Sequence, residues 1–76
     1  MRRPFRRLYA AHVVVNLTSG TALDGYLVRQ DGPLLTLRAA TVHEPGAAPA
    51  PADGELVVER SRIDFIQHIT DTGGSA

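Results

Sequence analysis

Hydrophobic and polar residues alternate in short segments along most of the chain, and turn-forming residues separate these segments. The first segment, residues 12–18, places Val13, Val15 and Leu17 on one register, and Ser-Gly at 19–20 ends it. Alternation with a period of two, in a segment rich in β-branched residues, predicts a β-strand with one buried face.

Two more strands are predicted in the residues that follow. In residues 21–29 two leucines lie on one register, and Gly25 between them indicates a bend, a bulge or a close backbone approach. The turn sequence Asp-Gly-Pro leads into residues 34–42, where two further leucines alternate with polar residues. We expect this third strand to bend at Ala39 and Ala40.

Residues 43–54 break the alternation. This segment contains three of the five prolines and no large apolar residue. Because proline has no backbone N–H to donate to a sheet, the segment cannot be a central strand. We expect a flexible Pro/Ala surface loop here.

Two short strands complete the pattern, at residues 55–59 and 63–69, with Arg-Ser-Arg between them. Phe65 shares a register with two isoleucines in the second of these strands, so we expect its ring to lie in the core. Neither strand contains a proline that would protect a free sheet edge from pairing with another chain. The apolar residues that are candidates for a subunit-edge contact are Leu56, Val57, Val58, Ile63, Phe65 and Ile66.

The two ends of the chain follow other patterns. In residues 1–10, Pro4 suits a first helical turn and apolar residues recur at helical spacing, which predicts a short N-terminal helix. Residues 70–76 are polar and glycine-rich, and we expect a disordered tail. The predicted fold is therefore mainly β: a short helix followed by a strongly bent, five-stranded barrel in one domain at residues 11–69.

The formal net charge of zero conceals an uneven distribution of charge. Half of the basic residues lie in the first seven positions, which contain no acidic residue, so a basic arm precedes a mildly acidic body. This arm offers a polyanion or an acidic partner four candidate contacts, Arg2, Arg3, Arg6 and Arg7. The chain has arginine but no lysine, and it is rich in Ala, Gly and Pro. Such a composition is typical of a high-GC genome, such as that of an actinobacterium or its phage.

The residue patterns that most catalytic and metal sites need are missing from the sequence. There is no cysteine, and the three histidines have no short ligand spacing. No serine lies in a nucleophile-elbow motif, and no glycine-rich run leads into a helix as a phosphate-binding loop would. We therefore expect no enzymatic activity, no cofactor, no bound metal and no small-molecule substrate.

The sequence also bears on where the protein acts. It contains no run of about 18 apolar residues, the length that a membrane span requires. No apolar segment of the signal-peptide type follows the basic N-terminus. We expect a protein without membrane contact, located in the cytoplasm, or in the virion if a phage encodes it.

In their order and spacing, these segments resemble the two sequence motifs of the Sm-like (LSm) family. The first motif is a V-x-V-x-L strand, a glycine turn, a second strand with an internal glycine and then a third strand, and it resembles residues 13–37. The second motif is a short strand, a tight turn and a strand ending in I-x-x-I. It resembles residues 55–66, with Ile63 and Ile66 in the matching places. The resemblance covers residues 5–69.

The resemblance implies a strongly bent, five-stranded barrel that assembles into rings, in which the fourth strand of one subunit pairs with the fifth strand of its neighbour. The unprotected edges also favour a ring, because another copy can pair with them and a head-to-tail contact that closes produces a cyclic assembly. We therefore expect a homo-oligomeric ring. The alternative fold is a generic SH3-like barrel, which predicts a monomer with an aromatic groove, although the chain has only two Tyr, two Phe and no Trp.

The sequence departs from the family where RNA-binding members hold a base and its phosphate. These members carry an Asp and an Asn before the third strand, and an Arg-Gly pair before the last. Here Leu34 stands at the Asn place and Glu59 at the Arg place, and a carboxylate repels a phosphate. The weak candidates for RNA contact are the residues near these places, Gln30, Asp31, Arg60 and Arg62.

Two functions follow from these patterns. The first is a non-catalytic ring that acts as a structural scaffold or protein-interaction module, including a phage structural component. The second is an RNA-binding ring that uses the N-terminal arginines and the ring surface. We favour the first, because the edge residues are present while the family's RNA-pocket residues are not.

Overall fold

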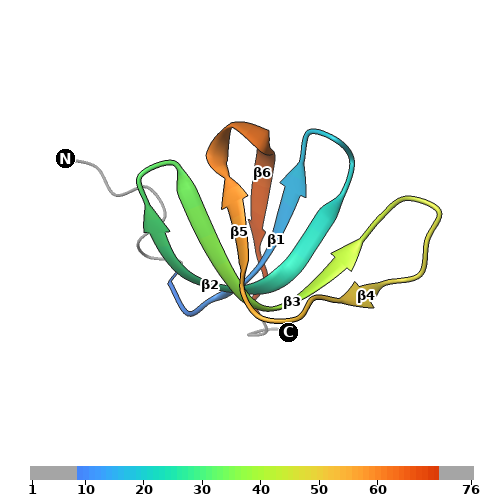
Figure 1. Ribbon diagram of the computed structural model, residues 1–76, viewed down its shortest axis with the longest axis horizontal. Helices are drawn as coiled ribbons and strands as arrows, with labels where there is room; N and C mark the ends of the chain where they lie inside the picture. The colour runs from blue at the N-terminus through green and yellow to red at the C-terminus, as the bar shows by residue number, and fades with distance from the viewer. Residues whose placement is uncertain (1–8, 71–76) are drawn as a thin grey trace.

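The computed structural model describes residues 9–70, which form one strongly curved antiparallel sheet (Figure 1). The strands follow the order β4-β3-β2-β1-β6, and β5 also pairs with β3. The elements are β1 (His12–Leu17), β2 (Ala22–Asp31), β3 (Leu34–His43), β4 (Ala50–Pro51), β5 (Leu56–Glu59), the 3₁₀ turn η2 (Arg60–Arg62) and β6 (Ile63–His68).

The predicted fold class is confirmed in its main part, a strongly bent antiparallel sheet. The five predicted strands are present as β1, β2, β3, β5 and β6. The predicted helix at residues 1–10 lies mostly outside the described residues, and Tyr9 and Ala10 form a turn. No α-helix occurs between residues 9 and 70. The predicted tail also lies outside this range, except for Thr70.

The Pro/Ala segment at residues 43–54, predicted to be a loop, contains the additional short strand β4. Pro51 pairs with Thr41 and Ala50 pairs with Val42 at the outermost position of the strand order. A proline is tolerated there because no further strand requires its missing N–H. The segment therefore folds back on β3 as a hairpin arm, which is visible beside β3 in Figure 1.

The sheet bends where β2 and β3 change register. Gly25 of β2 has no paired partner on β3, and the β2–β3 register shifts between Asp24 and Tyr26. On the opposite strand, Ala39 has a positive φ of 53°. A Cβ at Gly25 would lie only 3.0 Å from the carbonyl oxygen of Arg38. The bend predicted from Gly25 and the alanine pair is thus confirmed, and it depends on close approach of two backbones.

The core lies on the inner side of the curved sheet and is filled by alternate residues of its strands. Leucine and valine side chains predicted on the same register are buried together, as the period of two requires. The buried hydrophobic residues are Val13, Val15, Leu23, Leu27, Leu35, Leu37, Ala40 and Val58. The core is thin, as expected for a chain of 76 residues.

Candidate assembly interface

Two strands of the described chain have a free edge that nothing protects. β5 pairs only with β3, and β6 pairs only with β1, so each leaves its other edge unpaired within residues 9–70. The short η2 turn joins the two strands, as Figure 1 shows. Unpaired edges are templates for another strand, and neither edge contains the proline that marks β4.

The structure divides the six predicted edge residues into three groups. Val58 is buried in the core, and Leu56, Ile63 and Ile66 are partly buried against it. Val57 and Phe65 point outward, with 59% and 53% of their surface exposed. These are the largest exposed fractions among the exposed large hydrophobic residues between positions 9 and 70. Val57 and Phe65 are therefore the apolar side chains that can contact another molecule without disturbing the core.

The strand registers explain the positions of Val57 and Val58. Val58 lies opposite Leu35, and both belong to the hydrophobic core, whereas Val57 lies opposite Thr36, which is also buried but is not part of that core. Since successive side chains of a strand point to opposite faces, Val58 faces inward and Val57 faces outward. A lysine at Val58 would thus disrupt the core, so Val57 is the better position at which to test the edge.

The prediction that Phe65 lies in the core is wrong. Phe65 lies opposite Asn16 on the outer face, while Ile66 lies opposite the buried Val15. The pairing of β1 with β6 shifts between Asn16 and Leu17, so Ile63 pairs with Leu17 two positions before Phe65. This irregularity breaks the simple alternation from which the core position was inferred.

An open groove of about 500 Å³ lies beside β5. Apart from Val57, its apolar residues belong to the core or pack against it, and its polar residues come from the β1–β2 turn, from Glu44 after β3, from Glu59 of β5 and from η2. The lining consists of Leu17, Ser19, Thr21, Leu23, Val42, Glu44, Leu56, Val57, Val58, Glu59 and Arg62. The hydroxyl of Thr21 donates to Glu44 at 3.2 Å. Because one wall is β5, whose edge is free, a strand that pairs with this edge would lie beside the groove.

The turns that carry the weak RNA-contact candidates meet in the structure. The N–H of Arg60 in η2 donates to the carbonyl of Pro33 in the β2–β3 turn, at 2.7 Å. Gln30 donates its side-chain amide to the Gly32 carbonyl at 2.9 Å, and Asp31 accepts from Arg29 Nε at 3.0 Å. The turns of both sequence motifs therefore lie side by side, but the side chains of Gln30 and Asp31 are used within their own turn.

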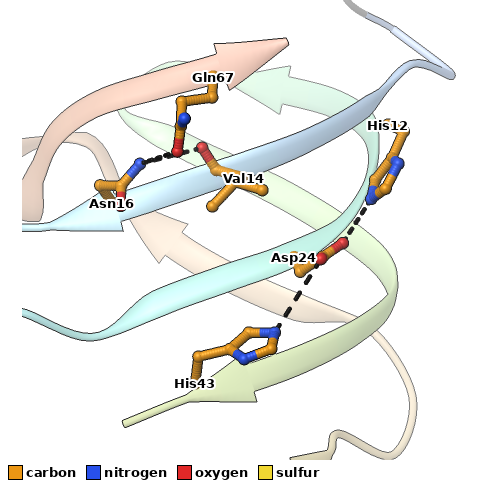
Figure 2. A network of polar contacts seen from close by, with 6 residues as sticks. All are labelled: His12, Val14, Asn16, Asp24, His43 and Gln67. Atoms are coloured by element: carbon orange, nitrogen blue, oxygen red, sulfur yellow. Dashed lines mark hydrogen bonds and ion pairs between the residues drawn. The ribbon is translucent and has the colours of Figure 1, made fainter. Parts of the chain in front are cut away.

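A polar network on the outer face joins three strands and was not anticipated from the sequence (Figure 2). His12 Nε2 donates to Asp24 Oδ1 at 2.5 Å, and His43 Nε2 lies 4.0 Å from Asp24 Oδ2. The ring of Tyr26 stacks on His12 with 5.2 Å between centroids. Nearby, Asn16 donates to Gln67 at 3.1 Å across β1 and β6. Because these side chains are partly exposed, we interpret the network as a set of surface polar contacts that link neighbouring strands.

Residues 9–70 contain neither a cluster of metal-ligating side chains nor a membrane-spanning helix. No three His, Asp or Glu side chains between residues 9 and 70 are placed to bind a metal ion. Within the same range, no helix is long and apolar enough to cross a bilayer.

Comparison with known proteins identifies the fold. Neither a family model nor a curated protein matches the sequence. Among solved structures, a heptameric archaeal Sm protein aligns with a TM-score of 0.75 and 22% identity, over 88% of this chain and 97% of that chain. The Sm protein of Pyrococcus abyssii in complex with a uridine heptamer aligns with a TM-score of 0.76 and 22% identity, over 90% and 100%.

A third similar structure belongs to a multi-protein complex. A chain in the crystal structure of the NatC complex bound to CoA aligns with a TM-score of 0.74 and 21% identity, over 91% of this chain and 87% of that chain. Each of the three alignments covers 88% or more of this chain. The chain therefore has the Sm fold.

Proposed function

We propose that this Sm-fold chain is a non-catalytic, Sm-like module that joins copies of itself head to tail, through β5 of one copy and β6 of the next, into a closed ring. The ring acts as a structural scaffold or as a surface for protein partners, in a cell or in a phage particle. The observation that carries the proposal is the pair of unpaired strand edges, each with an exposed large apolar side chain, Val57 and Phe65.

Two physical arguments support a ring rather than a pair. The β5 and β6 edges are different surfaces, so a contact between them leaves one edge of each type free for a further copy. Repetition of such a contact closes into a ring or extends into a filament, and closure leaves no β5 or β6 edge exposed. A chain of 76 residues with a thin core also gains apolar burial from neighbours that it cannot obtain alone.

The similar structures support both parts of the proposal. One of them is a heptameric archaeal Sm protein, which provides a precedent for ring assembly on this fold. Another belongs to the NatC complex bound to CoA, which provides a precedent for the fold as part of a multi-protein assembly. Fold alone does not determine function, so the proposal rests on the edges.

Replacing Val57 with lysine tests the edge. We expect the wild-type chain to form a closed oligomer in native mass spectrometry, and the Val57→Lys variant to be monomeric at the same concentration. A charge placed in an apolar strand interface costs about 3 kcal/mol, which weakens each contact roughly 100-fold. Because Val57 is 59% exposed, the variant should keep its fold, which circular dichroism can check.

The matched control is Ala48→Lys, which adds the same charge at an exposed position of the 43–54 segment, away from both edges. We expect this variant to form the wild-type oligomer. A Val57→Lys variant with the mass of the wild-type oligomer would show that the β5 edge is not the interface. A monomeric wild-type chain would refute self-assembly as a whole.

RNA binding by the ring is the second candidate function, and it has its own support. The turns of the two motifs meet at Arg60 and Pro33. A similar structure contains an Sm protein with a uridine heptamer. The four arginines of the arm would repeat around a ring and multiply a weak positive field. Glu59 weakens this candidate, because it places a carboxylate beside η2.

Changing the four arginines of the arm to serine tests this second function. If the ring binds single-stranded RNA through Arg2, Arg3, Arg6 and Arg7, the variant should lose most of its affinity. The slope of log K against log salt should also become shallower by about 3, because each lost phosphate contact contributes about 0.7. Fluorescence anisotropy with an oligouridine over a salt series measures both quantities.

The control for this experiment is Arg29→Ser, which removes an exposed arginine that is paired with Asp31. It should leave affinity and slope nearly unchanged. Binding that survives the loss of all four arm arginines would place the site on the sheet, near Arg60 and Arg62. If the wild-type chain binds no RNA, the RNA-binding function is refuted and only the scaffold function remains.

A further inference from the structure

We infer that the outer face of the sheet carries a stacking site for a base of single-stranded RNA, formed by Tyr26 with His12 against its ring and Arg38 beside it. The site lies on β1, β2 and β3, and it uses neither the arginine arm nor the turns of the two motifs. The inference rests on RNA binding, the second candidate function, and adds a separate contact to it. It follows from the pairing, the stacking and the exposure of these three side chains.

The three side chains form one row across neighbouring strands. His12 of β1 pairs with Tyr26 of β2, and Tyr26 pairs with Arg38 of β3. Directly opposite residues of paired strands point to the same face. Leu27, which follows Tyr26, is fully buried, so Tyr26 points outward and the row lies on the outer face. Tyr26 therefore has an imidazole on one side and a guanidinium on the other.

The ring of Tyr26 is supported by protein on one side and is still open to solvent. His12 stacks on it with 5.2 Å between the centroids and 25° between the planes. His12 is itself held by its hydrogen bond to Asp24, as Figure 2 shows. Tyr26 nevertheless remains 41% exposed. A ring that is already held in place loses little side-chain entropy when a base stacks on it, and every base has a π-face to offer.

Arg38 provides the positive charge that such a site needs. Its side chain is exposed, and it makes no ion pair and no cation–π contact within residues 9–70. Single-stranded nucleic acids are typically bound by exposed rings that stack on bases and by neighbouring cations that contact the phosphates. Sheets bind RNA in this way through aromatic residues on their strands. The pair of Tyr26 and Arg38 on adjacent strands fits one base and its phosphate.

The surroundings of the row favour RNA over a protein partner. The two carboxylate oxygens of Asp24 face His12 and His43, at 2.5 and 4.0 Å, so this charge is engaged within the sheet. In the next outward row Val14 pairs with Asp24 on one side and with Gln67 on the other. Polar groups thus interrupt the apolar surface, whereas a protein interface needs a broader apolar core.

Tyrosine fluorescence reports this contact directly, because the chain has two tyrosines and no tryptophan. The Tyr9→Phe variant keeps Tyr26 as its only tyrosine. We expect a short oligouridine at low salt to quench the emission of this variant, in parallel with the rise in anisotropy of the labelled oligonucleotide. Inorganic polyphosphate, which carries negative charge but no bases, should leave the emission unchanged.

Variants at Tyr26 separate stacking from charge. Tyr26→Ala should weaken the binding of oligouridine at least about fivefold, the lower end of the loss that follows removal of a stacking ring. Tyr26→Phe keeps the ring and is the matched control, so it should bind as the wild type does. Native mass spectrometry and circular dichroism check that both variants keep the wild-type oligomer and fold.

Arg38→Gln tests the phosphate contact. This variant should bind oligouridine more weakly, and its slope of log K against log salt should become shallower by about 0.7, the contribution of one phosphate. The control is Arg29→Gln, because Arg29 is exposed but already paired with Asp31. It should leave both the affinity and the slope nearly unchanged.

The possible results distinguish the site from RNA binding as such. Oligouridine binding without quenching of Tyr26, or binding that Tyr26→Ala does not weaken, would overturn the site while RNA binding stands. A wild-type chain that binds no oligouridine would overturn the RNA-binding function and the site together. The quenching measurement uses an intact Tyr26, so it decides the question even if Tyr26→Ala fails to fold.

Discussion

Replacing Gly25 with valine should unfold most of the protein. A Cβ at this position would lie 3.0 Å from the Arg38 carbonyl oxygen and 3.1 Å from the Ala40 Cα, and both atoms belong to backbone that cannot move aside without opening the bend. Overpacking by a single small group typically costs about 1–3 kcal/mol, and the branched valine adds two more methyl groups. A domain of 76 residues has a total stability of about 4–11 kcal/mol.

Urea unfolding followed by circular dichroism measures this effect, with Gly25→Ala as the smaller step in the same series. The control is Gly32→Asn in the β2–β3 turn, where φ is +60° and no atom lies within 4 Å of the added Cβ. Asparagine adopts this left-handed conformation with little strain, so the control should stay close to the wild-type midpoint. A Gly25→Val variant with the wild-type midpoint would contradict the dependence of the bend on this close approach.

The bend and the core are the parts of the fold that the sequence predicts well. Alternation with a period of two places leucines and valines on a single face, and a glycine within such a strand indicates a bend because no other residue permits the same backbone approach. The structure confirms both features at Leu23, Gly25 and Leu27. These inferences succeed because they depend on residues close to one another in the chain.

The features that the sequence does not reveal depend on how distant strands pair. Phe65 leaves the core because the β1–β6 pairing shifts at Asn16, which no local pattern in β6 encodes. The surface network is hidden for the same reason, since His12 and Asp24 are twelve positions apart and meet only across paired strands. Pro51 joins the sheet because it lies on an outermost strand, where no further strand needs the backbone N–H that proline lacks.

The candidate interface was predictable to a similar, partial degree. The absence of proline and the apolar composition made the segments that became β5 and β6 candidates for edge pairing, and the structure leaves one edge of each unpaired within residues 9–70. The same pattern could not separate Val57 from Val58, because both are apolar and adjacent. Only the pairing of Val58 with Leu35 reveals which of the two is committed to the core.

Replacing Leu27 with alanine should lower the free energy of unfolding by about 2–5 kcal/mol, as the truncation of a fully buried leucine does. Leu27 is fully buried and is one of the largest buried side chains in the described core, so the lost methyl groups leave a cavity. In so thin a core few neighbours can move to fill it. The control is Leu34→Ala, which removes the same atoms from a side chain that is 39% exposed and should change stability far less.

This variant also separates folding from assembly. If only folded copies join the ring, the wild-type Tm should rise with protein concentration, because assembly draws on the folded state alone. Leu27→Ala should lower the Tm at every concentration but keep this rise, since Leu27 is buried on β2, which carries neither free edge. Val57→Lys should show the reverse, a Tm that no longer depends on concentration. Calorimetry over a hundredfold range of concentration distinguishes the two, and a wild-type Tm that is independent of concentration would argue against assembly through these edges.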